Sequence, residues 1–347
     1  STHEFENIIL DEAQNIKNHK SQTSQACRSL NSKFKFVLSG TPVENSVKEI
    51  WSIFDFLLPG LLGTMGVFKG RYDNNDVVSE DARASSTELA TRIKPFILRR
   101  MKKNLLKQLP PKQEQILYCE LDESQKTLYA ALARDAGTLL DESLNKKRFT
   151  VLALLLRLRQ VCCHPALIPS VRESKEEVSS AKFELLKELI YEIRDSSHRV
   201  LIFSQFTSML KIISQWLKDE NIKFEYLDGG TNERQQKVDR FNEDESIPVF
   251  LLSLKAGGTG LNLTGADTVI HYDMWWNPQV EDQATDRTHR IGQTKAVNVI
   301  KLVAKNSIEE KILTLQKQKR KLFENLMDGI PQKLGDLTQD DLKFLLT

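Results

Sequence analysis

Short apolar runs alternate with amphipathic segments through the second half of the chain, and this pattern restricts the fold more than any other feature. Five runs have the length and composition of strands; they span residues 199–204, 224–228, 249–253, 268–272 and 297–303. A segment with apolar residues at helical spacing precedes each of the first three runs; these segments cover residues 183–193, 209–220 and 233–241. Strands that alternate with helices form parallel sheets. We therefore expect a complete α/β unit built on a parallel sheet.

The start of the chain shows the same alternation in a shorter form. Residues 8–10 and 34–38 are strand-like, and residues 21–30 between them have helical spacing. A tight turn at residues 39–42 follows the second run, and residues 47–58 again have the pattern of a helix. We expect a second, smaller piece of parallel sheet here.

The middle of the chain has a different character. Three segments carry apolar residues three and four positions apart, which predicts helices; they cover residues 88–108, 124–144 and 150–163. Pro110 and Pro111 break the region, and the polar residues 171–180 are expected to form a linker. We predict a large, entirely helical insertion over residues 61–180.

Composition restricts the class of protein. A length of 347 residues predicts two or more domains, and 40% hydrophobic with 28% charged residues fits an ordinary globular protein. No run approaches the roughly 18 apolar residues that span a membrane. The chain starts without methionine and without the features of a signal peptide. We expect a truncated intracellular protein, either prokaryotic and cytoplasmic or eukaryotic and nuclear, although a processed or engineered terminus would look the same.

Cysteine and charge give two further expectations. The four cysteines lack a Cys-x-x-Cys pair, which favours a reducing compartment without disulfides. Cys162, Cys163 and His164 have no second ligand pair at zinc-finger spacing, so we interpret them as a packed helix end. The net charge of +2 is uninformative, but the segment from Arg92 to Lys112 holds eight basic residues and no acid. This run predicts either contact with phosphates or a solvated helix face.

An acidic pair, Asp11 and Glu12, closes the first strand-like run. In a P-loop NTPase, acids at such a strand end serve Mg²⁺ and the attacking water. Gln14 and the turn that contains Ser39, Gly40 and Thr41 would lie at the same edge of a parallel sheet, where ligands bind. However, none of the fifteen glycines is followed by lysine, so a Gly-Lys-Ser/Thr phosphate loop is lacking.

Two later segments are candidates for contact with phosphates. A glycine-rich segment over residues 254–263 follows a predicted strand, and its backbone could approach an anion closely or form only a turn. Gln283, Arg287 and Arg290 are spaced one turn apart on a predicted helix. They could act as arginine fingers toward a γ-phosphate, or they could lie on a helix surface with neighbouring acids.

A pair of tryptophans, Trp275 and Trp276, precedes this helix. Aromatic side chains beside a glycine-rich loop can stack on bases or sugars. Packing between domains is the equally strong alternative.

These segments occur together in the order of a known family. The chain contains Asp-Glu-Ala-Gln-Asn-Ile-Lys-Asn, Ser-Gly-Thr-Pro-Val-Glu-Asn, Lys-Ala-Gly-Gly-Thr-Gly-Leu-Asn-Leu and an Arg-Ile-Gly-Gln tail, with a modified Leu-Arg-Gln-Val-Cys-Cys-His-Pro motif between them. It resembles the Swi/Snf-family ATPases, the helicase-like double-stranded DNA translocases of superfamily two. The resemblance runs from about Ile8 to Met327.

The resemblance implies a fold and a domain order. The fold would be α/β, with RecA-like parallel sheets: a partial first lobe over residues 1–60 and a complete second lobe over residues 181–310. The helical insertion would match the family's protrusions over residues 61–180. A brace helix and tail would occupy residues 311–347.

The resemblance also implies roles for single residues. Asp11 would hold Mg²⁺ through the nucleotide, and Glu12 would serve the water, with Arg287 and Arg290 as the other catalytic residues. Further residues would bind ATP or couple its state to movement: Gln14, Ser39, Gly40, Thr41, Gly258, Gly260 and Gln283. Duplex DNA would contact a third set: Ser204, Gln205, Phe206, Lys255, Thr259, Asn262 and Trp276.

The expected cofactor is ATP with Mg²⁺, and the expected partner is double-stranded DNA or a nucleoprotein complex, with no membrane. The family's adenine-binding glutamine and phosphate loop would precede Ser1, so we expect these 347 residues to be inactive without them. Two alternatives stay open: an RNA helicase of the same superfamily, and a non-catalytic DNA- or protein-binding scaffold.

Overall fold

The computed structural model describes residues 4–40, 47–72, 80–98, 100, 109–140, 144–174, 178–257, 260–327 and 344–345. The chain divides into two compact units, which are described separately. Unit 1 comprises Ser1–Arg100 and Lys317–Thr338, and unit 2 comprises Met101–Gln316 and Gln339–Thr347. The expected domain boundaries at residues 60, 180 and 310 stay a prediction.

Unit 1 contains a small parallel sheet, β1 with β2. Its elements are β1 (Glu4–Leu10), a 3₁₀ turn η1 (Ala13–Ile16), α1 (Gln22–Arg28), β2 (Asn31–Val37), α2 (Val47–Leu57), α3 (Met65–Tyr72), α4 (Glu80–Ile93) and a second 3₁₀ turn η2 (Lys94–Phe96). Leu10 pairs with Val37, so the two strands end side by side. The side chain of Ser21 accepts a hydrogen bond from the Ser24 N–H and starts the connecting helix α1.

One face of this sheet is packed. Ile8 of β1, Ile16 of η1 and Phe56 of α2 form a buried cluster. The opposite face is exposed: its apolar side chains are between 45% and 61% accessible, and they are Phe5, Ile9, Phe34, Phe36 and Leu38. Unit 1 therefore buries only half of the apolar surface of its sheet.

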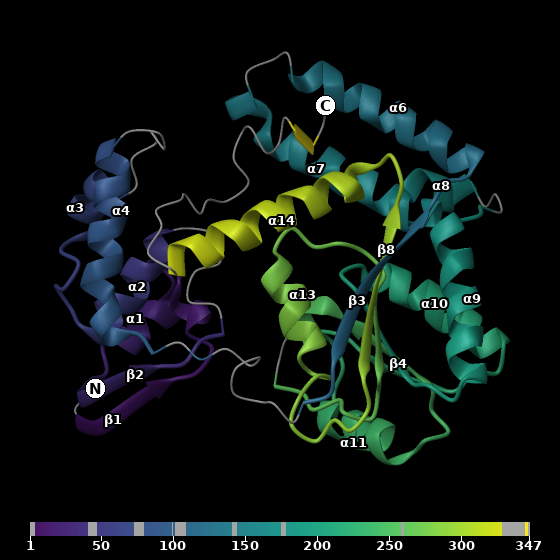
Figure 1. The fold of residues 1–347 in the computed structure, drawn as a ribbon. Helices are drawn as coiled ribbons and strands as arrows, with labels where there is room; N and C mark the ends of the chain where they lie inside the picture. The colour runs from purple at the N-terminus through teal and green to yellow at the C-terminus, as the bar shows by residue number, and fades with distance from the viewer. Residues whose placement is uncertain are drawn as a thin grey trace. The chain divides into compact units, whose positions relative to one another are not determined.

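Unit 2 is built on six parallel strands in the order β3-β8-β7-β4-β6-β5. Figure 1 shows this sheet with its flanking helices. The strands are β3 (Lys112–Cys119), β4 (Val200–Ser204), β5 (Phe224–Leu227), β6 (Val249–Ser253), β7 (Thr268–His271) and β8 (Val297–Ala304). The helices are α6 (Glu123–Leu140), α7 (Leu144–Cys163), η3 (Pro165–Leu167), α8 (Pro169–Ser174), α9 (Ala181–Asp195), α10 (Thr207–Asp219), α11 (Arg234–Glu243), α12 (Leu254–Gly257) and α13 (Pro278–Thr285). A further helix, α14 (Ile308–Met327), begins in unit 2, and its residues from Lys317 onward belong to unit 1.

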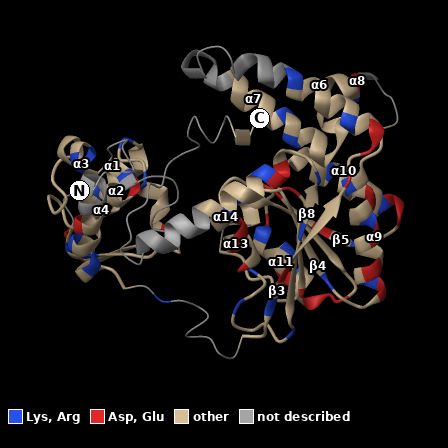
Figure 2. Ribbon diagram, turned by 45° about the horizontal axis from the view of Figure 1, so that its top comes forward, with Lys and Arg blue, Asp and Glu red and all other residues tan. Residues whose placement is uncertain are grey.

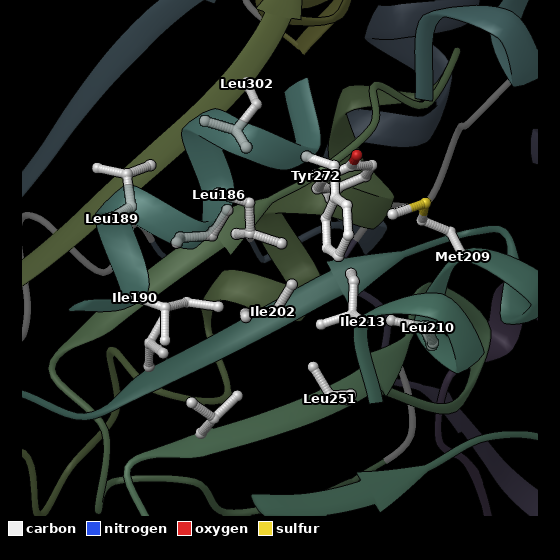
Figure 3. Packing of buried hydrophobic residues seen from close by; sticks show 14 of the residues in the cluster. Leu186, Leu189, Ile190, Ile202, Met209, Leu210, Ile213, Leu251, Tyr272 and Leu302 are labelled. Carbon is white, nitrogen blue, oxygen red and sulfur yellow. The ribbon is translucent and has the colours of Figure 1, made fainter. Parts of the chain in front are cut away.

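Alternate residues of the central strands enter two separate cores. Ile202 and Leu251 point to one face, where α9 and α10 cover them with Leu186, Leu210 and other apolar side chains, as Figure 3 shows. The neighbouring residues in each strand point to the other face, which is covered by α11 and α13. Because successive side chains of a strand point to opposite faces and both faces are covered, β4 and β6 are buried along their whole length.

The strand β3 corrects one expectation: residues 61–180 are not entirely helical. β3 pairs along its whole length with β8, from Lys112 opposite Val297 to Cys119 opposite Ala304. It lies at the edge of the sheet, and the first four residues of its Lys-Gln-Glu-Gln-Ile-Leu-Tyr-Cys sequence are exposed. An edge strand needs no continuous apolar run, which is why the sequence pattern did not reveal it. The predicted linker is also partly helical, because α8 occupies Pro169–Ser174.

Candidate functional site

The acidic pair lies where β1 ends, in a turn that the end of β2 holds in place. The Leu38 N–H donates to the Leu10 carbonyl at 2.8 Å, and the Ala13 N–H donates to the Leu38 carbonyl at 3.1 Å. Glu12 between them has a left-handed backbone, with φ 50° and ψ 53°. Since a non-glycine residue rarely adopts this conformation, the turn is held by its surroundings.

A chain of side-chain hydrogen bonds joins the two strand ends in unit 1. The Gln14 amide donates to a Glu12 carboxylate oxygen at 2.6 Å, and the Ser39 hydroxyl donates to the Gln14 amide oxygen at 3.1 Å. Asp11 is exposed, and its carboxylate accepts the Glu12 N–H at 2.8 Å. The structure thus brings together four of the predicted residues at the expected sheet edge. Gly40 follows them, and Thr41 lies outside the described residues.

This edge has the chemistry of a magnesium and nucleotide site. Mg²⁺ prefers oxygen ligands and is usually held through one or two carboxylates together with phosphate oxygens. Asp11 offers an exposed carboxylate, and Glu12 offers a second, half-buried carboxylate whose orientation is set by Gln14. The donor set therefore fits Mg²⁺ bound with a nucleotide.

In unit 2, the glycine-rich segment begins as a short helix, α12, before the chain turns. A Cβ atom on Gly257 would lie 2.4 Å from the Phe203 ring, so only glycine fits against this buried side chain. Gly260 has a positive φ of 35°. Lys255 and Asn262 are exposed on either side, while Gly258 and Thr259 lie outside the described residues.

The predicted arginine helix is shorter than expected. α13 ends at Thr285, so Arg287 and Arg290 lie in the turns that follow, and only Gln283 is helical. Thr285 is the last residue of the helix, and its hydroxyl is hydrogen-bonded to the buried His271 ring at 2.9 Å. Arg287 is half-buried and Arg290 is exposed. The prediction that Gln283, Arg287 and Arg290 share one helix is therefore wrong for both arginines.

Gln293 ties this arginine segment to the end of the glycine-rich segment. Its side-chain amide donates to the carbonyls of Thr264, Ala266 and Thr288 at 3.3, 2.7 and 3.3 Å. The Leu263 N–H donates to the Arg287 carbonyl at 3.0 Å. Sequence reasoning missed Gln293 as a site residue, because its partners are main-chain carbonyls that no side-chain pattern reveals.

The third group of predicted residues lies after β4 and β7. Ser204 and Phe206 are buried, Gln205 is half-buried, and the Ser204 hydroxyl donates to the Asp273 carboxylate. Burial raises the pKa of Asp273 to about 6, although the nearby Arg159 guanidinium opposes this shift. The carboxylate thus joins the residues after β4 to the loop after β7.

The Cys162-Cys163-His164 segment is a packed helix end, as expected. Both cysteines are fully buried at the end of α7, and burial raises the pKa of each thiol. The His164 ring accepts the Ala166 N–H at 3.2 Å and so caps η3. In the described part of the chain, no group of three or more histidine, cysteine and acidic residues is arranged to hold a metal ion.

Comparison with known proteins gives the family. The SNF2-related domain model matches residues 1–167, and the helicase conserved C-terminal domain model matches residues 181–292. The solved SWI2/SNF2 ATPase core of Sulfolobus solfataricus, in complex with dsDNA, is 37% identical, and the match covers 98% of this chain and 72% of that chain with a TM-score of 0.56. The chain belongs to the SWI2/SNF2 family. The expected RecA-like class, with parallel sheets and many helices, is thereby confirmed.

Curated SWI2/SNF2 relatives are much longer than this chain. An uncharacterized ATP-dependent helicase of Mycoplasma genitalium is 37% identical, over 94% of this chain and 31% of the relative. Human TATA-binding protein-associated factor 172 is also 37% identical, over 99% of this chain and 22% of the relative. The chain thus spans less than a third of either protein. Among the described helices, none combines the length and apolar character needed to cross a bilayer.

Proposed function

We propose that this chain is part of an ATP-dependent double-stranded DNA translocase. The observation that carries the proposal is the strand-end turn of unit 1, where Gln14 fixes a half-buried Glu12 beside an exposed Asp11. The family membership supports it, since relatives carry names of ATP-dependent helicases. The solved Sulfolobus core was captured with dsDNA.

The residues divide the work of ATP hydrolysis between them. Asp11 is suited to hold Mg²⁺, which when bound neutralises charge on the phosphate oxygens. Glu12 is suited to orient the attacking water, because Gln14 holds one of its carboxylate oxygens and fixes its direction. Arg287 and Arg290, on the segment held by Gln293, are suited to stabilise charge that develops on the transferred phosphoryl group.

Arg287→Ala in the full-length protein tests this division. A positioned arginine finger contributes about 10³–10⁵ to turnover. We therefore expect kcat to fall far more than the affinity for the nucleotide, measured by steady-state hydrolysis and by equilibrium nucleotide binding. Arg234→Ala on α11 serves as the control, since this arginine donates hydrogen bonds to the Gly229 and Thr231 carbonyls of its own neighbouring turn. Unchanged turnover in Arg287→Ala would remove the finger assignment.

Duplex DNA is the proposed partner, through loops rather than through a basic stripe. Figure 2 shows acidic as well as basic residues along α9. Lys255 and Asn262 are exposed in the glycine-rich segment, and we assign them to the phosphate backbone. Ser204 and Phe206 are buried, so their role is to hold the loops. Most of the basic run from Arg92 to Lys112 lies outside the described residues.

Lys255→Ala tests the DNA contact. Loss of one phosphate contact reduces the slope of log affinity against log salt by about 1, and titration of a labelled duplex at several salt concentrations measures it. Stronger binding and ATPase stimulation by RNA than by DNA would favour the RNA helicase instead.

Finally, we propose that the 347 residues alone do not hydrolyse ATP, because they hold no Gly-Lys-Ser/Thr phosphate loop. The purified chain should show no DNA-stimulated release of phosphate above the level of its Glu12→Gln variant. Appreciable turnover would contradict this. An inactive full-length protein would instead support the scaffold alternative.

A further inference from the structure

A buried arginine lies in the last turns of α7, within the Leu-Arg-Gln-Val-Cys-Cys-His-Pro segment, and none of the roles assigned above uses it. Arg159 is 2% exposed, whereas Arg157 on the same helix is exposed to solvent. Removing a guanidinium from water is costly unless it finds partners. The partners of Arg159 therefore show what it is buried for.

Those partners belong to the loop that follows β7. The Arg159 guanidinium donates to the main-chain carbonyl of Met274. One of its nitrogens lies 4.0 Å from the Asp273 carboxylate, the limit of an ion pair. A bond to a loop carbonyl depends on the path of the backbone rather than on any side chain, so this contact fixes the loop itself.

Three aromatic rings surround the same guanidinium. Its central carbon lies 4.8 Å from the ring centroid of Trp276, 5.6 Å from that of Trp275 and 5.7 Å from that of Phe206. Cation–π attraction extends to about 6 Å and is strongest for tryptophan. Arg159 is thus the common neighbour of the paired tryptophans and of an aromatic residue that follows β4.

Asp273 extends this arrangement to the residues after β4. It accepts a hydrogen bond from the Ser204 hydroxyl, and the Gln205 N–H approaches both of its oxygens at 3.3 Å. Arg159 and Asp273 therefore join two loops, one after each strand, to helix α7. A planar guanidinium can stack on rings and donate in its plane at the same time, which a lysine ammonium cannot do.

We propose that Arg159 is a positioning residue that holds the Trp275–Trp276 loop against Phe206, and so sets the affinity for duplex DNA without itself contacting phosphate. The part of the proposal that concerns DNA affinity, its DNA half, rests on the proposed function, whereas the part that concerns the position of the loop does not. The position of the loop can be measured in the free chain. The two halves can therefore fail separately.

The first measurement reports the loop alone. With Trp51 and Trp216 replaced by phenylalanine, the remaining indoles of the chain are those of Trp275 and Trp276. In this background we expect Arg159→Met to increase quenching of indole fluorescence by acrylamide and to shift the emission to longer wavelength. Arg157→Met, on the exposed face of the same helix, is the matched control and should change neither.

Loss of Arg159 alone leaves Asp273 buried without its cation, and the variant could unfold for that reason. The double variant Arg159→Met/Asp273→Asn removes both charges and keeps an amide that can accept from Ser204. We expect it to fold, as judged by circular dichroism, and still to show a loosened loop. Arg159→Lys should loosen the loop as well, because it keeps only the charge. A folded double variant with the quenching of the parent would overturn the proposal.

The second measurement is binding of the 347-residue chain to a labelled duplex over a range of salt. We expect the double variant to bind on the order of tenfold more weakly, since stacking on one aromatic is worth about 1–3 kcal/mol. Its salt slope should equal that of the parent chain. A slope reduced by about 1 would mean that Arg159 contacts phosphate. An unchanged affinity would mean that the loop does not contribute to DNA binding. Either result overturns the proposal that Arg159 sets the affinity for duplex DNA. A parent chain that binds no duplex overturns the proposed function and the DNA half with it, while quenching still decides the position of the loop.

Discussion

The two sheets of this molecule have the same kind of strands but bury them differently. In unit 2 every residue of β4 and β6 is buried, because helices cover both faces of the sheet. In unit 1 Ile8 is the buried residue of β1, and one face of the sheet is exposed. Since two strands with one covered face form a weak structure, stability is expected to reside mainly in unit 2. The stability of each unit is therefore expected to depend on how many faces of its sheet are covered by helices, and not on the apolar composition of the strands alone.

The buried ion pair between Lys182 of α9 and Glu309 of α14 offers the largest expected effect. Both side chains are almost inaccessible; burial by itself would lower the pKa of Lys182, but the Glu309 carboxylate raises it. Lys182→Met leaves the carboxylate without its cation, which costs roughly 3–5 kcal/mol of the free energy of unfolding of unit 2. Denaturant titration followed by Trp216 fluorescence measures this.

Unit 1 serves as the internal control for that variant, because Trp51 reports its unfolding once Trp216, Trp275 and Trp276 are replaced by phenylalanine. The second variant Lys182→Met/Glu309→Gln keeps an acceptor for the Ala304 N–H, which Glu309 now binds at 2.8 Å. It should be more stable than Lys182→Met alone. Equal loss in both variants would show that packing, rather than the unpaired charge, is responsible.

A matched pair of isoleucines tests the comparison between the sheets directly. Ile202 of β4 is fully buried, and Ile9 of β1 is 61% exposed. Ile202→Ala should destabilise unit 2 by about 2–5 kcal/mol through lost burial and a cavity, whereas Ile9→Ala should change unit 1 by less than about 0.5 kcal/mol. Denaturant curves with the two tryptophan reporters give both values. A large loss at Ile9 would mean that the exposed face is covered in solution.

The smallest expected effect is one of pH. Burial lowers the pKa of His164 to about 4, so the folded state binds its proton less readily than the unfolded state, whose pKa is about 6.5. Its contribution to stability is present above pH 6.5 and is lost as the pH falls toward 4, by at most roughly 3 kcal/mol. The pKa of His271 is also lowered by burial, so this residue too favours unfolding as the pH falls. The pKa of Asp273 is raised to about 6, so this residue has the opposite effect on stability.

His164→Asn isolates this contribution. Asparagine is a good N-cap residue and can still accept the Ala166 N–H, but it does not titrate. The variant should lose less stability than the parent between pH 7 and pH 4.5, measured by unfolding of unit 2. The same pH dependence in both proteins would remove His164 as the cause.

The sequence predicted the central strands well, because β4 and β6 are continuous apolar runs between helices. It missed β3, whose polar half is stabilised by pairing with a strand nearly two hundred residues away. It also extended α13 through Arg290, because the helical spacing of Gln283, Arg287 and Arg290 continues past Thr285, where the helix ends. Local patterns thus sufficed for elements that are buried on both faces.

The candidate site divides in the same way. Asp11, Glu12, Gln14 and Ser39 were predictable, because parallel strands end at one sheet edge. Arg159 and Gln293 were not, since their main partners are carbonyls and rings brought close only by the fold. Both residues lie in recognisable segments, Leu-Arg-Gln-Val-Cys-Cys-His-Pro and Arg-Ile-Gly-Gln, but these segments do not reveal which loop each residue holds.

The pairing of β3 with β8 also sets an order in time. Among the described strands of its sheet, β3 is the first to leave a ribosome, and β8, which pairs with it, is the last. At a synthesis rate of about 5–20 residues per second, the wait for a partner roughly 185 residues downstream lasts on the order of ten to forty seconds. During that time the four other strands can assemble around β4. β3, the first strand of this sheet to be made, is then the last to be added to it.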